Sequence, residues 1–339
     1  MRRCGVFRSR YKRDSSVVTV LTRDYTGVSA GSSSKFVSGS VNSANSAQSS
    51  AISAKSSSTG LIAGTVIIAF FTILAIFADV FTAITGNDPY TEYSEYLDAN
   101  SVPTGVGGIS SKHWFGVTPL RGLDVFAIVA HGARVSLGIG VASTLISLLI
   151  GVTIGMIAGY WGGWVDAILS RSMDVFFGFP FLIFSIAISA IIPQSFPRPL
   201  LLILIIGFFG WPGVARLVRG QTLTLKSRNF SVASQIMGAS SWHILSKQIL
   251  PNMLPMLLVN VTFSIPGRIG SEAALSFLGV GMNPPSPSWG RAISDAIQWT
   301  FVDPWYLLFP GMSLFLLTWG FNLLGDGLEQ FVREFRSGV

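Results

Sequence analysis

The chain has 339 residues, of which 50% are hydrophobic and 12% are charged, and its formal net charge is +7. Ordinary soluble domains carry about 25% charged residues, so this composition favours a polytopic membrane protein over a soluble enzyme. The single cysteine, Cys4, excludes a disulfide framework and a cysteine-based metal cluster. The three histidines are scattered in sequence, and we therefore expect no metal site.

The first 60 residues differ in composition from the rest of the chain. Basic residues dominate the first thirteen positions, and residues 29–60 are rich in Ser, Ala, Asn and Gly. Such a segment buries too little apolar surface to offset its ordering entropy, so we expect a disordered cytoplasmic tail. A polybasic patch on anionic lipid is the alternative reading. The apolar run begins too late for a cleavable signal peptide.

Six apolar segments approach or exceed the length of about 20 helical residues that a bilayer core requires. We predict spans at 61–84, 134–160, 165–192, 200–217, 253–269 and 305–324, followed by a charged tail at 331–339. The second span is rich in glycine, which lets helices approach closely in lipid. These glycines are Gly138, Gly140, Gly151, Gly155 and Gly159.

The third span carries two opposite charges, Arg171 and Asp174. Residues three apart share a helical face, so we expect these two side chains to pair with each other. An ionisable group inside a membrane is also a functional hypothesis by default. The pair therefore either orients the helix or takes part in gating or subunit contact.

A polar, basic stretch at 219–252 separates two of the predicted spans. Its first half has helical spacing up to Met237, and Gly238 then suits the left-handed conformation of a helix end. Ser240 or Ser241 can cap a second helix, in which Trp242, Leu245 and Ile249 share one apolar face and Pro251 marks the end. The stretch predicts a helical hairpin outside the bilayer whose apolar stripe docks against a partner.

This hairpin resembles the EAA loop of the membrane subunits of ABC importers, which seats in a cleft of the ATPase. The pieces Val218–Gln221, Met237–Ser240 and Gln248–Asn252 are similar to those of the dipeptide/oligopeptide permease branch. The phrase EAALSFLGVGMNPPSPSW, at 272–289, resembles that branch closely, and HWFGVTPLRGLDVFAIVAHGAR, at 113–134, does so more loosely. Val232 stands where the family's loop has its glutamate, so that residue's ionic contact does not carry over.

The resemblance implies an all-helical permease subunit with the six-helix type I fold and a cytoplasmic coupling hairpin. The partners implied are a second permease subunit of the DppB or OppB type, two ATPase subunits and an extracytoplasmic substrate-binding protein. The chain would bind no cofactor and catalyse no reaction, while the ATPases use ATP with magnesium. The residues implied in ATPase coupling are Val232, Ala233, Ser234, Gly238, Ala239, Trp242, Leu250 and Pro251.

Several alternatives remain open. Glu272 either marks the outer end of the fifth span or binds a peptide amine, and Asp295 and Asp303 are expected to be solvated loop charges. An importer of nickel, glutathione or another small solute would share these motifs. A secondary transporter would show internal repeats, which are not evident, and an intramembrane enzyme needs a base, whereas His131 and His243 fall outside the predicted spans. Basic residues concentrate on the side of the hairpin and both tails, so we expect that side to be cytoplasmic, in a cell membrane.

Overall fold

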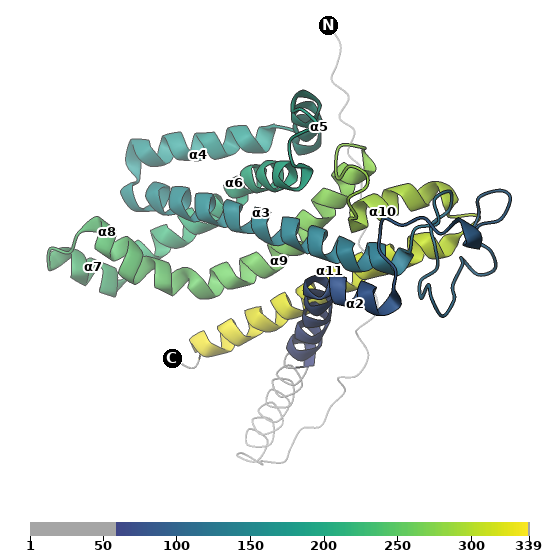
Figure 1. Ribbon diagram of the computed structural model, residues 1–339. Helices are drawn as coiled ribbons and strands as arrows, with labels where there is room; N and C mark the ends of the chain where they lie inside the picture. The colour runs from purple at the N-terminus through teal and green to yellow at the C-terminus, as the bar shows by residue number, and fades with distance from the viewer. Residues whose placement is uncertain (1–58, 338–339) are drawn as a thin grey trace, which may run out of the picture. The chain divides into compact units, whose positions relative to one another are not determined.

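The computed structural model describes residues 59–337, with side chains described up to residue 333. The expectations about the N-terminal tail therefore lie largely outside the described residues. The described part is built from helices joined by loops, with two isolated β-bridges (Figure 1). The helices are Thr59–Ile76, α2 (Ala78–Thr85), α3 (Val125–Trp161), α4 (Gly163–Gly178), α5 (Phe181–Ile191), α6 (Arg198–Lys226), α7 (Asn229–Ile236), α8 (Ser241–Ile244), α9 (Leu250–Phe277), α10 (Trp289–Ala296) and α11 (Pro304–Ser337).

Five of the described helices are long and apolar enough to cross a membrane by themselves. They are Thr59–Ile76, α3, α6, the continuous helical segment Ser241–Phe277, and α11 up to Arg333. The pair α4 and α5 passes the same test together, but it is bent by 80° at its break. Pro180 lies in that break, and proline cannot continue a helical hydrogen-bond ladder. The described residues thus supply up to six spans, in agreement with the expected all-helical class.

Helix α3 packs along α6 through glycine; the sequence predicts such close approach but not the partner helix. A side-chain carbon added at Gly151 would lie 2.6 Å from Val214, and one at Gly155 would lie 2.5 Å from the carbonyl oxygen of Ala215. Helix α3 also approaches α9 closely at Gly140, against Ile269. Because glycine has no side chain at these positions, the backbones come close enough for dispersion contacts to hold them. A larger side chain does not fit there.

Charged side chains join α4 to α6 in addition to this packing. The guanidinium of Arg219 donates through both Nε and Nη2 to the Asp166 carboxylate, with an Nη2–Oδ2 distance of 2.6 Å. This two-point geometry is the strongest common form of a protein ion pair. The pair fixes the end of α6 that leads into the hairpin.

Several helices begin or end at positions that differ from the predicted segments. Helix α3 begins at Val125 and not at Arg134, and α9 extends to Phe277 and thus includes Glu272. His131, which was placed outside the spans, is therefore part of α3. Charged residues marked these boundaries in the sequence, but a charged residue can stay within a helix when a neighbouring element binds it.

Candidate functional site

The turn of the hairpin is closed by backbone hydrogen bonds around Gly238. Gly238 has φ of +82°, which confirms the left-handed conformation expected from the sequence. Its N–H donates to the Gln235 carbonyl oxygen, and the N–H of Ala239 donates to the Ser234 carbonyl oxygen, both at 3.0 Å. These two bonds form a Schellman motif, which satisfies the last carbonyl groups of a helix. The turn between α7 and α8 is thereby fixed.

The second helix of the hairpin begins at a serine cap and is fastened to the first. Of the two serines considered, Ser240 is the cap, and its Oγ accepts the N–H of His243 at 3.3 Å. Gln248 donates its Nε2 to the Ser234 Oγ at 2.5 Å and so connects the two helices. Ser234 thus has a structural contact inside the hairpin.

The base of the hairpin is buried, while its tip exposes apolar side chains. Ile244, Leu245 and Ile249 are almost fully buried in a cluster with residues of α3, α6 and α9. Trp242, in contrast, is 65% exposed, so the expected single stripe of Trp242, Leu245 and Ile249 is divided, and only Trp242 of the three is free to contact a partner. Its position near the start of α8 places its side chain beyond the packed helices.

Trp242 is one member of a group of exposed side chains at this end of the hairpin. Ile236 and Met237 are 82% and 79% exposed, and Val232 is 41% exposed. Ala233 and Pro251 are exposed as well, whereas Leu250 is partly buried against the base. We call Val232, Ile236, Met237 and Trp242 the tip surface. It is apolar and lies on a base that packing and hydrogen bonds hold in place.

The sequence predicts that Pro251 ends the second helix, but the helix continues past this residue. The chain passes through a wider π-helical turn at Leu245–Ile249 and continues as α9. Proline has no N–H for the carbonyl four residues earlier, and its ring crowds that carbonyl. A π turn, which bonds five residues apart, changes the hydrogen-bond register before such a position. The hairpin is therefore continuous with a membrane-crossing helix.

The charged pair predicted within the third span does not form. Asp174 instead accepts a hydrogen bond from Nη2 of Arg216 on α6, at 2.8 Å, and Arg171 has no ion-pair partner among the described residues. Arg216 also lies over the ring of Phe177, 4.4 Å from its centroid. A helical spacing of three permits a local pair but does not exclude a partner from a packed neighbour, and here α6 supplies it.

Glu272 is fully buried and not at a water-exposed end of the fifth span. Its carboxylate accepts hydrogen bonds from Ser136 Oγ on α3 at 3.1 Å and from Ser276 Oγ at 2.8 Å. The Ser136 Oγ in turn accepts the backbone N–H of Trp289 at 3.3 Å. Glu272 thus joins α9 to α3 and, through Ser136, to the start of α10. This geometry gives it a structural role, and the side chain is not open to a ligand.

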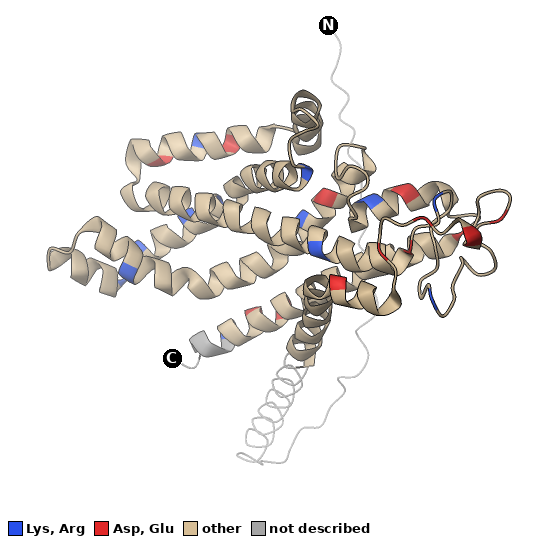
Figure 2. Cartoon of the chain, in the orientation of Figure 1, with Lys and Arg blue, Asp and Glu red and all other residues tan. Residues whose placement is uncertain are grey.

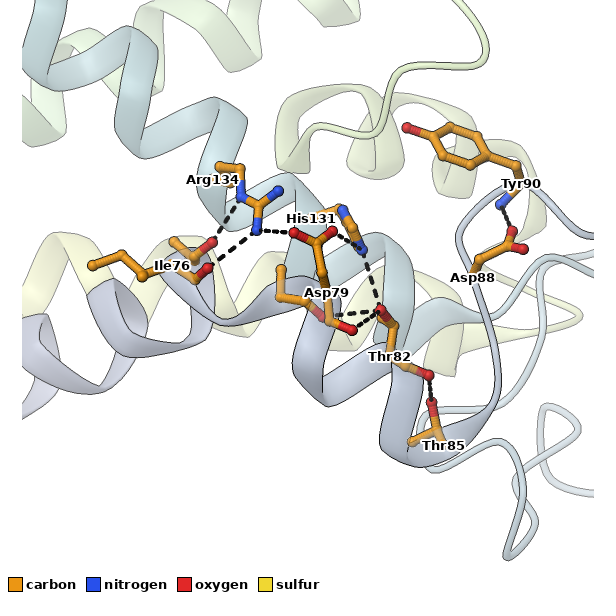
Figure 3. Close-up of polar contacts among 10 residues, drawn as sticks. Ile76, Asp79, Thr82, Thr85, Asp88, Tyr90, His131 and Arg134 are labelled. Atoms are coloured by element: carbon orange, nitrogen blue, oxygen red, sulfur yellow. Dashed lines mark hydrogen bonds and ion pairs between the residues drawn. The ribbon is translucent and has the colours of Figure 1, made fainter.

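A second polar cluster surrounds the break between the first helix and α2 (Figure 3). Arg134 of α3 donates to the carbonyl oxygens of Ala75 at 2.9 Å and Ile76 at 3.2 Å, and to the Asp79 carboxylate at 2.8 Å. A cation at a helix C-terminus binds carbonyls that have no intrahelical partner. Nε2 of His131 lies 3.4 Å from Thr82 Oγ1. Arg134 therefore stabilises the chain at the break, where the first helix ends before α2 begins.

The loop between α2 and α3 contains a buried cluster that the sequence did not reveal. His113 and Asp124 are each 1% exposed, and His113 Nδ1 lies 2.7 Å from Asp124 Oδ2. Asn87 donates to the same oxygen at 2.9 Å, while Asp124 Oδ1 caps α3 by accepting the N–H of Ala127 at 2.7 Å. His113 packs between the rings of Tyr93 and Tyr96. Both residues lie in the phrase at 113–134, so the resemblance of that phrase was the signal that could have identified them.

Asp303 is also buried, so the expectation that it is a solvated loop charge is wrong. It is 3% exposed, and its Oδ1 accepts the N–H of Trp305 at 3.2 Å just before α11. Burial raises the pKa of the Asp303 carboxyl above its ordinary value. Asp295, in contrast, is partly exposed and pairs with Arg291 at 3.1 Å.

A cavity of about 150 Å³ lies between the loop before α3 and α10. Its charged lining residues are already paired, Arg121 with Glu92 and Arg291 with Asp295. The cavity therefore offers few free polar groups to a ligand.

Charge is distributed unevenly between the ends of the described helices. Figure 2 shows acidic residues gathered in the segment between α2 and α3, whereas basic residues occur around the hairpin. That segment contains the acids Asp88, Glu92, Glu95, Asp98 and Asp124 and the bases Lys112 and Arg121. The stretch 219–252 contains Arg219, Lys226, Arg228 and Lys247 and no acidic residue.

Comparison with known families decides what kind of membrane protein carries this hairpin. The family described as "binding-protein-dependent transport system inner membrane component" matches residues 151–334, which are more than half of the chain. The chain belongs to this family. The matched region includes α6, the hairpin and α9, and membership in a family of inner membrane components agrees with the apolar spans.

Three curated relatives are more than a third identical to this chain over the aligned residues. The dipeptide transport system permease protein DppC of Alkalihalophilus pseudofirmus is 38% identical over 268 residues, which cover 79% of this chain and 83% of that protein. The oligopeptide permease OppC of Bacillus subtilis is 37% identical and covers 78% and 82%. The glutathione permease GsiD of Pectobacterium atrosepticum is 40% identical over 222 residues, covering 66% and 72%. The expected resemblance to the peptide permease branch is confirmed.

Solved structures give a more distant match. An inward-facing structure of the MetNI methionine ABC transporter has a TM-score of 0.48 and 22% identity, and the match covers 61% of this chain and 95% of that one.

Proposed function

We propose that this chain is the permease subunit of an ATP-driven ABC importer that takes up dipeptides or oligopeptides. An extracytoplasmic binding protein delivers the peptide, and the chain forms the translocation path with a second permease subunit of the DppB or OppB type. The relatives named for dipeptide and oligopeptide transport, which match over most of their length, support this proposal.

The hairpin couples the chain to its ATPases. The observation that carries this assignment is the contrast between the buried base and the tip surface, in which Ile236, Met237 and Trp242 are at least 65% exposed. A contiguous exposed apolar patch on a rigid support is typical of a protein interaction site. Val232 contributes an apolar contact where a glutamate would give an ionic one, so the coupling interface of this chain relies on hydrophobic burial.

The chain itself binds no cofactor and is not an enzyme. ATP and magnesium belong to the two ATPase subunits, and closure of these subunits on ATP moves the hairpins. The π turn and the start of α9 transmit this motion, because the second helix of the hairpin and α9 form one continuous helical segment. The spans cross the cell membrane, and both termini and the hairpin are cytoplasmic.

Glutathione is the second candidate substrate, because GsiD is 40% identical over two thirds of this chain. Glutathione is itself a small peptide, so the two candidates share a terminal ammonium, carboxylates and amide groups. The binding protein and the second permease both contribute to selectivity, so the assembled complex determines which of the two substrates is transported.

The first experiment is purification of this chain from mild detergent, followed by mass spectrometry of the proteins that accompany it. We expect a second permease and ATPase subunits, and the reconstituted complex should accumulate labelled dipeptide in liposomes only with ATP. Glutathione and nickel uptake are measured in parallel. Recovery of this chain alone, with gradient-driven and ATP-independent uptake, would overturn the proposal in favour of a secondary transporter.

A further inference from the structure

The ion pair between Asp174 and Arg216 lies on an exposed face of α4 and α6. The two side chains are 53% and 54% exposed, although the oxygen and nitrogen atoms are 2.8 Å apart. Arg171, on the same side of α4 one turn earlier, is exposed as well. This face therefore presents two cations and one anion.

Both residues lie inside helices that are candidate membrane spans. Asp174 lies three turns into α4 from Gly163, or roughly 16 Å at 1.5 Å per residue. Arg216 lies in the half of α6 that leads to the hairpin. The 29 residues of α6 make it roughly 44 Å long, more than the hydrocarbon core of about 30 Å, so the pair lies within the spans on the hairpin side of their middle.

Charged side chains at this depth do not face lipid. They are directed toward the interior of a helix assembly or toward a water-filled cavity, because hydrocarbon solvates neither charge nor hydrogen-bonding groups. The described part of this chain does not cover the pair. In the assembled transporter this face consequently borders water or a partner chain.

The surface next to Arg216 is open and lacks bulk. Gly213 and Gly220 lie on the same side of α6, three and four residues from Arg216, and both are exposed. A side-chain carbon added at either glycine would contact nothing within 4 Å. At Gly151, Gly155 and Gly159 of the α3–α6 contact, in contrast, an added carbon would lie less than 3 Å from neighbouring atoms. The open stripe leaves room for a solute beside the charges.

We propose that the face of α4 and α6 that carries Asp174 and Arg216 borders the water-filled translocation path, and that this ion pair binds the charged termini of a transported dipeptide. Arg216 binds the carboxylate and Asp174 the ammonium group. The inference rests on the proposed peptide transport. Binding exchanges one internal ion pair for two ion pairs to substrate, so neither charge becomes unpaired at membrane depth. Arg171 adds a positive field that favours the carboxylate end.

Water accessibility tests the placement of this face. In a Cys4→Ser background, Gly213→Cys and Gly220→Cys are each introduced into the reconstituted complex and treated with a charged methanethiosulfonate reagent, which needs a hydrated thiolate. The matched control is Phe315→Cys on α11, where the exposed neighbours Met312 and Trp319 are apolar.

We expect at least one of the two glycine positions to react about tenfold faster than position 315, and a dipeptide to slow that reaction. Equal rates at all three positions, in a complex that still transports, would show that lipid or a partner chain covers the face and would overturn the proposal. Two positions are used because Gly213 lies next to Pro212, where a cysteine can disturb the helix.

Substrate chemistry tests the role of the charges. Uptake of a dipeptide is compared with uptake of its C-terminally amidated form in wild-type complex and in Arg216→Gln. We expect wild type to prefer the free carboxylate by about tenfold or more, as loss of a charge-assisted contact implies, and Arg216→Gln to lose that preference. Asp174→Asn should instead lose discrimination against an N-acetylated dipeptide. Arg333→Gln removes an exposed arginine far from the pair and should behave as wild type.

The two failures are distinguishable. If wild-type complex takes up no peptide, the proposed function fails. If it transports peptide and Arg216→Gln lowers the maximal rate for free and amidated forms equally, the pair is structural and only the present inference is wrong.

Discussion

At the scale of single residues, Gly238 determines the shape of the hairpin turn. Its φ of +82° suits glycine, and asparagine tolerates this region better than other side chains do. A Cβ there would meet no neighbouring atom, so the cost of substitution is in the backbone alone. Proline is more damaging, because it fixes φ near −65° and removes the N–H that donates to Gln235.

We therefore expect Gly238→Asn to retain coupled transport and Gly238→Pro to lose it while the complex still assembles. The measurement is the ratio of substrate-stimulated ATP hydrolysis to peptide uptake in liposomes, with subunit content checked by gel filtration. Normal hydrolysis and uptake in Gly238→Pro would contradict the assignment of the turn to ATPase coupling.

Asp124 has three partners at the start of α3, and its removal should destabilise the outer loop. Asp124→Ala removes the helix cap and the acceptor of the buried His113, and it leaves Asn87 Nδ2 with only its bond to the Lys112 carbonyl oxygen. Lost caps and unsatisfied buried groups each cost on the order of 1–3 kcal/mol, so we expect a loss of about 3 kcal/mol in the free energy of unfolding.

The measurement is thermal unfolding in detergent, with tryptic cleavage of the 86–124 loop as a local readout. Glu95→Ala is the control, because Glu95 is an exposed acid of the same loop. Equal unfolding temperatures and cleavage rates for the two variants would show that the buried cluster contributes little.

At the scale of elements, the α3–α6 contact depends on glycine at particular faces of α3. Gly155→Ala would place a methyl group 2.5 Å from the Ala215 carbonyl oxygen, and the helices would have to separate. Overpacking of this kind costs about 1–3 kcal/mol. Gly138→Ala changes the same residue type on the same helix, but its methyl group would meet nothing within 4 Å.

We expect Gly155→Ala to lower the unfolding temperature of the purified complex and Gly138→Ala to leave it unchanged or raise it, since alanine favours a helix over glycine. A scan monitored by intrinsic tryptophan fluorescence distinguishes the two. If both variants unfold together, close backbone approach is not what holds α3 on α6.

The helices and their glycine contacts could be predicted from sequence because they follow from local composition. A run of about 20 apolar residues has few alternatives to a membrane helix, and a glycine stripe identifies a contact face without naming the partner. Gly238 was predictable for the same reason, since its conformation is a local property.

Partners from other elements could not be predicted in this way. Arg134 looked like a span boundary because its acceptors, the carbonyls of Ala75 and Ile76, lie in another helix. Asp174 binds Arg216 from α6 and not its neighbour in sequence. His113 and Asp124 meet only after the loop between them has folded back. Such contacts depend on tertiary packing, which spacing along one helix does not contain.

At the scale of the whole molecule, the acidic segment between α2 and α3 and the basic hairpin should lie on opposite sides of the membrane. Basic residues are retained in the cytoplasm during insertion, and acidic loops carry no such constraint. The hairpin is on the cytoplasmic side in this arrangement, where it can reach an ATPase. The arrangement is tested with one cysteine on each side in a Cys4→Ser background, Glu95→Cys in the loop and Met237→Cys on the tip surface, both at exposed positions.

A membrane-impermeant maleimide is added to cells whose outer envelope layers have been removed and whose cell membrane is still sealed. It should label position 95 at once and position 237 only after the cell membrane is permeabilised. Position 237 should then be protected when the ATPases are bound, because the proposed docking covers the tip surface. Labelling of position 237 from outside would reverse the topology. It would also separate the hairpin from ATP, so the coupling role of the tip surface would have to be abandoned together with the orientation.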